Sequence, residues 1–461
     1  NSIIFKEENN VKKKSILNRG LSLILSLFMI LGMVPLQAFA TDAALSAVED
    51  WQEGLELDPV SVTSGTAIQA YTTSGAAIVY AGQEEDGDYT IEDAGQLVML
   101  AERVNGGMPY EESTFTLLED IDLSTVCGPN VDGSAVNWTP IGNNDTNPFS
   151  GNFDGDGHTI SNLYIILGSE AGKRVEYQGL FVKDANIKIL TVTGREDGSG
   201  ITVDIVSEYQ AGIAGYALNS TFVNCTNYVN IRTTRTSGKA DYYGGIVGQG
   251  ADLTIRQCKN YGDIHGNSDC AGICGSTSLD GTKSLIENCE NYGAISSYGT
   301  SVAGIVGSIS KHEITVIDCI NYGEINARSK VAGICGEANG TALIENCIND
   351  KNAVITTTDA TGSGFGGIVG LLKSNDVKVS DCVNHGSVTN IFSKDSGGIV
   401  GIFNAGTITD SINTGTVTAQ IEGGGLVGYL QGGTSTSTLN LFNSYNSGEI
   451  VGIDNSHNTP G

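Results

Sequence analysis

The chain has 461 residues, and its 24 Lys and Arg residues against 52 Asp and Glu residues give a formal net charge of −28 at pH 7. A surface of this charge repels nucleic acids and anionic lipid headgroups, so we expect neither as a partner. Glycine contributes 62 residues. This is about twice the average share of ~7% and is typical of a protein rich in β-turns.

Residues 1–40 are predicted to be a secretory signal peptide. Lys12–Lys14 form a basic region, Leu21–Val34 form an apolar run, and Ala38–Ala40 form a small-x-small cleavage site. The apolar run has 14 residues. A spanning helix needs about 20, which disfavours an uncleaved anchor. Val11, directly before the lysines, is a candidate for the true start. We therefore expect a secreted, extracellular protein with no membrane insertion after cleavage.

A linker and a helix are expected to precede the main domain. Residues 41–86 are rich in Ala, Ser, Thr, Gly and acids with weak periodicity, which predicts a flexible linker. In the next region, 87–170, Thr90–Asp93 resembles a capping box. Apolar residues from Ala94 to Val104 then recur at helical spacing before two glycines. One amphipathic helix in this place is suited to cover the open end of a solenoid core.

Strand-like segments follow the helix. Phe115–Leu123 and His158–Ile166 are expected to be the first strands of the domain. Between them, Asp154–His158 (DGDGH) has the acidic start of a calcium loop. His158 and Ile165 stand, however, where that loop needs oxygen ligands. We interpret the segment as a tight Asp-Gly turn and predict no metal site there.

Residues 171–461 are built of repeats. A motif of the form Gly/Ala-Gly-Ile/Leu-small-Gly occurs eight times, with successive copies 27 to 34 residues apart. The copies are Ala211–Gly215, Gly244–Gly248, Ala271–Gly275, Ala303–Gly307, Ala332–Gly336, Gly366–Gly370, Gly397–Gly401 and Gly424–Gly428. Gly179–Phe181 is a candidate for a degenerate ninth copy. Such a period, with short β-rich runs between the motifs, predicts an all-β fold. We expect a right-handed parallel β-helix of about 8–11 coils with a short N-terminal capping helix.

The aliphatic position of the motif is expected to form an inward ladder, as in Ile246 and Ile273. The next position is also small and apolar, as in Val247. Two adjacent residues of a regular strand cannot both face inward. A bulge or a packed outer face must therefore occur at each copy.

A second motif, Cys-x-Asn-Tyr-Gly-x-Ile in its fullest form, runs in step with the first. Its asparagine is present in all eight copies: Asn227, Asn260, Asn291, Asn321, Asn349, Asn384, Asn413 and Asn446. Stacked asparagine amides can form hydrogen bonds from coil to coil, so we predict a structural ladder. The glycine two residues later, as in Gly293, is expected at a corner with positive φ.

The ten cysteines are predicted to be buried free thiols. Six of them share one repeat position, where Ser411 and Ser444 replace cysteine in the last copies. Two more, Cys274 and Cys335, exchange with valine. Interchange with Ser and Val is typical of a small buried residue and disfavours the disulfides expected of a secreted chain with an even count. Cys270 and Cys274 form the only close pair and have no further ligands at zinc spacing.

Two outward columns are candidate functional positions. Tyr228, Tyr261, Tyr292 and Tyr322 share one phase and would either stack on sugar units of a glycan or stack on one another. In the first case, replacing the last three with alanine should weaken glycan binding. Asp318, Asp381 and Asp410 alternate with asparagines at another position. Lys and Arg do not cluster beside them, so we predict a polar ladder and no catalytic residue.

These motifs resemble the GLUG-motif repeats of bacterial secreted and surface proteins. The resemblance covers about residues 88–452 and includes Trp138–Gly142 (WTPIG) and Phe149–Ile165. It implies a β-helix outside a bacterial cell, often adhesin-like. Some relatives are amino-terminal regions of IgA-specific metallopeptidases, but this chain has no His-Glu-x-x-His.

The sequence therefore predicts a monomeric adhesin-like binding module or non-catalytic stalk, with no cofactor and with a glycan or protein as its ligand. The alternatives are a polysaccharide-active β-helix enzyme and the front of a larger surface metallopeptidase. A groove of acids with a Lys or Arg on one face would favour the former. A zinc motif after Gly461, in a missing carboxy-terminal region that could also attach the chain to the cell surface, would favour the latter.

Overall fold

The computed structural model describes residues 87–143, 146–167, 174–175, 177–182, 185–203, 206–233, 241–357, 360–432 and 437–453. All of them belong to the compact unit Ser64–Gly461. The predicted signal peptide and linker lie outside the described residues.

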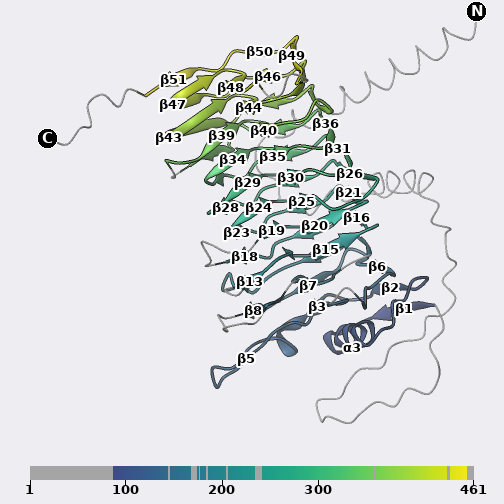
Figure 1. Ribbon diagram of the computed structural model, residues 1–461. Helices are drawn as coiled ribbons and strands as arrows, with labels where there is room; N and C mark the ends of the chain where they lie inside the picture. Colours follow the sequence, from purple (N-terminus) through teal and green to yellow (C-terminus); the bar gives the residue numbers. More distant parts are fainter. Residues whose placement is uncertain are drawn as a thin grey trace, which may run out of the picture. The chain divides into compact units, whose positions relative to one another are not determined.

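The unit is a parallel β-solenoid of about nine turns, which confirms the predicted fold class. Three long sheets run along it (Figure 1). The first, of 12 strands, extends from β1 (Asp88–Ile91) to β49 (Leu439–Phe442), and the second, of 11 strands, from β3 (Ile121–Asp122) to β50 (Tyr445–Asn446). The third has 16 strands, because the long strand β43 (Ser387–Gly397) joins two ladders. The first two sheets continue without a break across residue 170, where we expected the repeat domain to begin.

A fourth sheet of eight strands, from β15 (Ala214–Leu218) to β48 (Val427–Leu430), completes the wall. One coil illustrates the order. It contains β21 (Thr254–Arg256), β22 (Lys259–Asn260), β23 (Ile264–Gly266), β24 (Ser268–Ala271) and β25 (Cys274–Thr277). β26 (Lys283–Glu287) starts the next coil beside β21. The second motif thus lies around β22, and the glycine motif lies at the turn from β24 to β25.

This turn explains how two adjacent apolar residues are both buried. Ile273 lies between β24 and β25, and Cys274 begins β25. Both are fully buried and belong to one hydrophobic core that runs through the coils. Because the chain changes direction between two sheets here, the alternation of a single strand does not apply. The predicted ninth copy is also real, since Phe181 pairs with Ala214 in the next coil.

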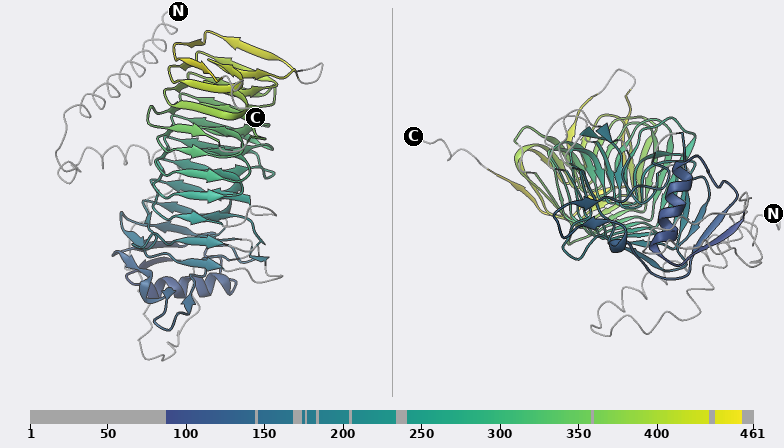
Figure 2. Two further views of the ribbon diagram at one scale, coloured as in Figure 1. Left: turned by 90° about the vertical axis from the view of Figure 1, so that its left-hand side faces the viewer. Right: turned by 90° about the horizontal axis from the view of Figure 1, so that it is seen from below.

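A helix, α3 (Ala94–Asn105), lies at the amino-terminal end of the stack, as Figure 2 shows. Leu97, Leu100 and Val104 join the core, so α3 is the predicted cap. Its start differs from the sequence expectation. Thr90 belongs to β1, and Asp93 is the N-cap, with its side chain accepting a hydrogen bond from the Gln96 backbone N–H at 2.9 Å. The capping box is therefore three residues later than predicted, and β1, before the helix, was missed.

The predicted asparagine ladder is present in all eight coils. The Nδ2 of each of the first seven donates to Oδ1 of the asparagine in the next coil, over 2.6–2.9 Å. The second glycine of the other motif makes room for it, because a Cβ on Gly272 would lie 2.1 Å from Asn291 Oδ1. The two repeated motifs are therefore two sides of one contact.

The expectation for the later glycine was wrong. Gly293 does not have a positive φ; instead, a Cβ there would lie 2.1 Å from the Gly262 carbonyl oxygen of the previous coil. Glycine is needed for close stacking of coils, not for a left-handed corner. At the corner between the first two sheets, the left-handed residues are those of the predicted polar ladder, such as Asn288 (φ 53°) and Asp318 (φ 56°).

All ten cysteines are buried and unpaired, as predicted. The six in the shared column each donate a weak hydrogen bond to the carbonyl oxygen two residues earlier, at 3.2–3.5 Å. Burial raises the pKa of Cys274 to about 12. Such thiols behave as small core residues. Within the part of the chain described, no helix has the length and apolarity to cross a membrane.

Candidate functional site

The four predicted tyrosines form one continuous stack. Neighbouring rings of Tyr228, Tyr261, Tyr292 and Tyr322 have centroids 4.6 Å apart and planes within 9° of parallel. Parallel pairing of successive coils imposes this spacing, because it equals the distance between adjacent strands. The Tyr292 hydroxyl also donates to Glu290 Oε2 at 2.7 Å.

The stack changes what these tyrosines can offer a ligand. Neighbouring rings cover both faces of Tyr261 and Tyr292, so the 38% of Tyr292 that is exposed lies at its ring edge. Tyr228, at the end of the stack, is 47% exposed. The arrangement is therefore the self-stacked alternative. Glycan binding stays a prediction. A sugar could contact only the ring edges and the two ends of the stack.

A second outward column begins with aromatic rings and ends with charges. Its first six members are Tyr177, Tyr209, Tyr242, Asp269, Ser301 and Lys330. The first three rings are stacked, with centroids 5.1 and 5.3 Å apart. From Tyr209 onward each residue has a positive φ, between 49° and 70°. The column lies where β19 (Asp241–Gly244), β24 and their successors approach the fourth sheet.

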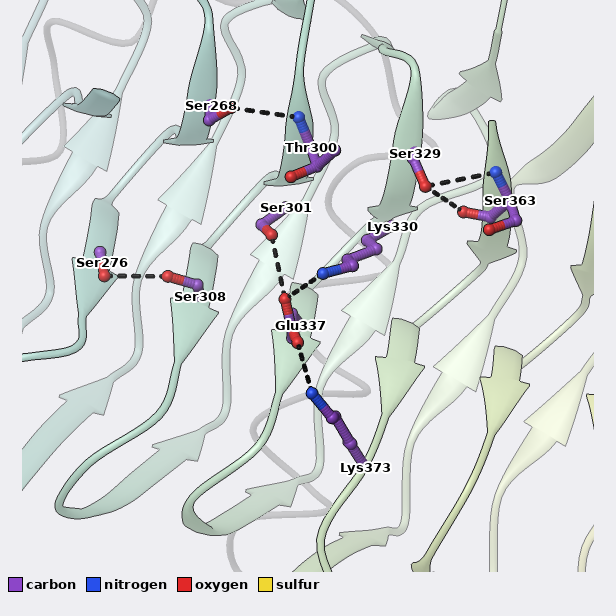
Figure 3. Close-up of polar contacts among 10 residues, drawn as sticks. All are labelled: Ser268, Ser276, Thr300, Ser301, Ser308, Ser329, Lys330, Glu337, Ser363 and Lys373. Atoms are coloured by element: carbon purple, nitrogen blue, oxygen red, sulfur yellow. Dashed lines mark hydrogen bonds and ion pairs between the residues drawn. The ribbon is translucent and has the colours of Figure 1, made fainter. Parts of the chain in front are cut away.

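Charged and hydroxyl groups gather at this corner in the middle coils, as Figure 3 shows. We call the group the corner cluster; it consists of Ser301, Ser308, Lys330, Glu337 and Lys373, which the figure labels, and of Asp269 beside Ser308. Glu337 Oε2 lies 2.5 Å from Lys330 Nζ and accepts from Ser301 Oγ at 3.4 Å. Its other oxygen, Oε1, lies 3.8 Å from Lys373 Nζ. The Glu337 side chain is 15% exposed, so this ion pair is stronger than a surface pair but still reaches solvent.

Asp269 supplies a second carboxyl two coils from Glu337. Burial raises the pKa of Asp269 to about 7, and a hydrogen bond to Ser308 opposes the shift. Ser308 in turn lies 2.9 Å from Ser276 through their hydroxyl oxygens. A carboxyl group with a pKa near neutrality can donate or accept a proton at physiological pH, which makes the cluster a candidate for acid–base chemistry as well as for binding.

The sequence analysis missed the corner cluster, because its residue types change from coil to coil. Alignment on the glycine motif would have found it. Tyr209, Tyr242, Asp269, Ser301 and Lys330 each stand two residues before the first residue of a motif copy. The prediction that Lys and Arg do not cluster concerned the Asp318 column, which is on a different corner.

The DGDGH segment is a turn, as predicted. Asp156 and Gly157 have φ of 46° and 84°, and the Asp156 backbone N–H donates to Asp154 Oδ1 at 3.0 Å. Asp154 also pairs with Lys188 Nζ at 2.9 Å. Among the described residues, no group of three or more His, Cys, Asp or Glu side chains is arranged to hold a metal ion.

Comparison with known proteins gives one structural likeness. No protein-family model matches the sequence, and no curated protein matches it. The structure is similar to the crystal structure of a protein described as a putative immunoglobulin A1 protease from Bacteroides ovatus, with 21% sequence identity and a TM-score of 0.43. The match covers 66% of this chain and 77% of that chain.

Proposed function

We propose that the chain is an exported bacterial repeat protein of the GLUG type that acts as an adhesin-like binding module or stalk and does not perform catalysis. The observation that carries the proposal is the contrast between the inside and the outside of the coils. The asparagine ladder repeats inside in eight coils. The outward columns change from rings to charges and hydroxyls over the same length.

Such a contrast suits an extended recognition surface. Each repeat contacts only its neighbours, so outward side chains can vary without loss of the core. Aromatic rings at the surface with polar groups beside them are typical of sites that bind another molecule. The acidic composition and the predicted signal peptide support a location outside the cell.

The proposal is tested by location and adhesion. Fractionation of source cells should place the protein outside the cytoplasm, and mass spectrometry should find Thr41 at its amino terminus. Beads that carry the purified chain should adhere to surfaces coated with glycans or matrix proteins. Beads that carry a protein of scrambled sequence instead should not. An unprocessed chain kept in the cytoplasm, or beads that adhere to nothing, would contradict the proposal.

The corner cluster favours a second candidate, a polysaccharide-active β-helix. Here the acids Asp269 and Glu337 lie on one face with the cations Lys330 and Lys373, which is one part of the arrangement that would favour an enzyme, the other part being a groove. In that case Asp269 would act as the acid–base group, because burial raises its pKa to about 7. Lys330 would neutralise a substrate carboxylate.

This candidate is tested with an acidic polysaccharide such as polygalacturonate. An enzyme would release new reducing ends, and Asp269→Asn would abolish the release while Asp318→Asn, on the other corner, would not. Absence of turnover by the unaltered chain removes the candidate and leaves the binding proposal in place. The metallopeptidase alternative is tested by the reading frame beyond the codon for Gly461, in which a His-Glu-x-x-His motif would support it.

A further inference from the structure

The tyrosine stack has an open place at its amino-terminal end. Thr193 follows Val192, and Val192 pairs with Asn227, the residue before Tyr228. Thr193 therefore holds in its coil the position that Tyr228 holds in the next. Because threonine has no ring, the outer face of Tyr228 is not covered by a fifth ring in the stack.

A pocket of about 340 Å³ lies at this place. It is lined by Thr193, Gly194, Arg195, Glu196, Ser199, Tyr228 and Asn230. Its ring wall is Tyr228, which is 47% exposed while its other face is stacked on Tyr261. A flat or chair-shaped ring in the pocket would continue the stack at the spacing that the solenoid already imposes.

Hydrogen bonds hold the far wall of the pocket in place. The turn after Thr193 is closed by the Arg195 N–H, which donates to the Ser199 carbonyl at 2.8 Å. Asn230 Nδ2 donates to the Gly198 carbonyl at 3.1 Å and ties this turn to the coil of Tyr228. The pocket is thus formed before a ligand arrives, which lowers the ordering cost of binding.

Polar groups stand at the rim of the pocket. The Arg195 side chain is 24% exposed, and its Nε, which is itself buried and lies 3.7 Å from Asp197 Oδ2, has no hydrogen-bond partner among the described residues. Glu196 is exposed and adds a carboxylate. A ring face together with hydrogen-bond donors and acceptors at its edge is the chemistry that recognises a sugar, whose apolar face stacks while its hydroxyls are bound.

We propose that this pocket, the Tyr228 slot, binds one neutral pyranose ring of a glycan, stacked on Tyr228. The charges favour a neutral ring, because Arg195 of the lining already pairs with Asp197 at 3.7 Å, the lining also contains the Glu196 carboxylate, and the whole chain carries −28. An acidic sugar would meet the Glu196 carboxylate and a cation that is already paired. The inference rests on the proposed role as a binding module and names the ligand class and the place.

Saturation-transfer NMR on the full chain tests the slot. The probes are the methyl glycosides of glucose, galactose and N-acetylglucosamine, with methyl glucuronide and N-acetylphenylalanine amide as the acidic and aromatic alternatives. At least one neutral glycoside should receive saturation through its ring protons. Tyr228→Leu should weaken its binding about tenfold, because the stacking face is lost.

Two further variants separate the slot from general effects. Tyr322→Leu removes the ring at the opposite end of the same stack and should leave binding unchanged. Thr193→Tyr adds a ring in the slot, removes only the hydrogen bond from Thr193 Oγ1 to the Gly194 carbonyl at 3.2 Å, and should abolish binding while circular dichroism stays unaltered. Unaltered circular dichroism then shows that the loss of binding does not come from unfolding.

Four results would overturn the slot. One is an equal loss in Tyr228→Leu and Tyr322→Leu, another is retained binding in Thr193→Tyr, and the third is a preference for the glucuronide or the phenylalanine amide. Absence of binding by every probe also overturns it. Failure of the slot leaves the adhesion assay unaffected, so beads that still adhere show a binding module whose site lies elsewhere.

Discussion

Substitution of a middle asparagine of the ladder should destabilise the solenoid by an amount that the hydrogen bonds allow us to work out. Asn291 Nδ2 donates to Asn321 Oδ1 at 2.9 Å and to the Gly293 carbonyl at 3.0 Å. Its Oδ1 accepts from Asn260 Nδ2 at 2.9 Å. Asn291→Ala removes all three bonds in a fully buried place. At a net value of about 1 kcal/mol each, the free energy of unfolding should fall by about 3 kcal/mol.

The matched control is the last asparagine of the ladder. Asn446 accepts from Asn413 at 2.6 Å and donates to the Gly448 carbonyl at 2.9 Å, and within the described residues no further asparagine continues the ladder after it. It is also only partly buried, so water can replace the lost partners. Asn446→Ala should therefore cost about 1 kcal/mol or less.

Urea denaturation followed by circular dichroism measures both variants, and hydrogen exchange read by mass spectrometry locates the effect. In a solenoid each coil depends on its neighbours, so Asn291→Ala should raise exchange most in the coils on either side of it. If Asn291→Ala and Asn446→Ala lowered stability equally, within about 0.5 kcal/mol, the ladder would not be a source of stability and the reasoning would be refuted.

Three other perturbations test the close contacts and the buried groups. A Cβ on Gly212 would lie 1.8 Å from Asn227 Oδ1, so Gly212→Ala alone should lower the free energy of unfolding by more than about 2 kcal/mol. In a chain that already carries Asn227→Ala the same substitution should cost much less, and a double-mutant cycle measured by urea denaturation tests this difference. Burial raises the pKa of Cys274 to about 12, and the other cysteines are buried too. A thiol reagent at pH 8 should therefore react with no cysteine quickly in the native chain and with all ten in urea. Reaction of fewer than ten in urea would indicate a disulfide. The pKa of Asp269 is raised from 3.8 to about 7, so its carboxyl favours the folded state below pH 3.8 and loses this contribution as the pH rises through 7. Asp269→Asn should therefore reduce the decline of stability over this range, and an unchanged pH profile would show that the carboxyl is not buried in solution.

The interior of the solenoid could be predicted from the sequence because each inward position accepts few residue types. Ile273 recurs as Ile or Leu, and Asn291 recurs without exception, since each lies against its own equivalent in the next coil. Parallel, in-register stacking converts a requirement at one position into a column. Repetition in the sequence was therefore direct evidence of burial.

Backbone conformation at the corners was harder to predict. Asn288 and Asn291 are three residues apart and both belong to repeated polar positions, yet only Asn288 has a positive φ. Composition favours asparagine at both, because the residue tolerates the left-handed region and also donates from its amide. The side chain of Asn291 forms hydrogen bonds within the ladder, and these can be recognised only when the position of the preceding coil is known.

The corner cluster and the open place beside Tyr228 escaped prediction for the opposite reason, which is that each begins where a column stops repeating. Tyr242 gives way to Asp269 at the corner, and the ring column of Tyr228 is preceded by Thr193. In a continuous column the side chains are one another's partners, because each ring stacks on the next and each amide forms a hydrogen bond with the next. A break leaves one ring face or one charged group without its equivalent, and that group is then available to a ligand. On this fold we therefore expect binding to occur at discontinuities of the outward columns, while the repeated positions maintain the scaffold.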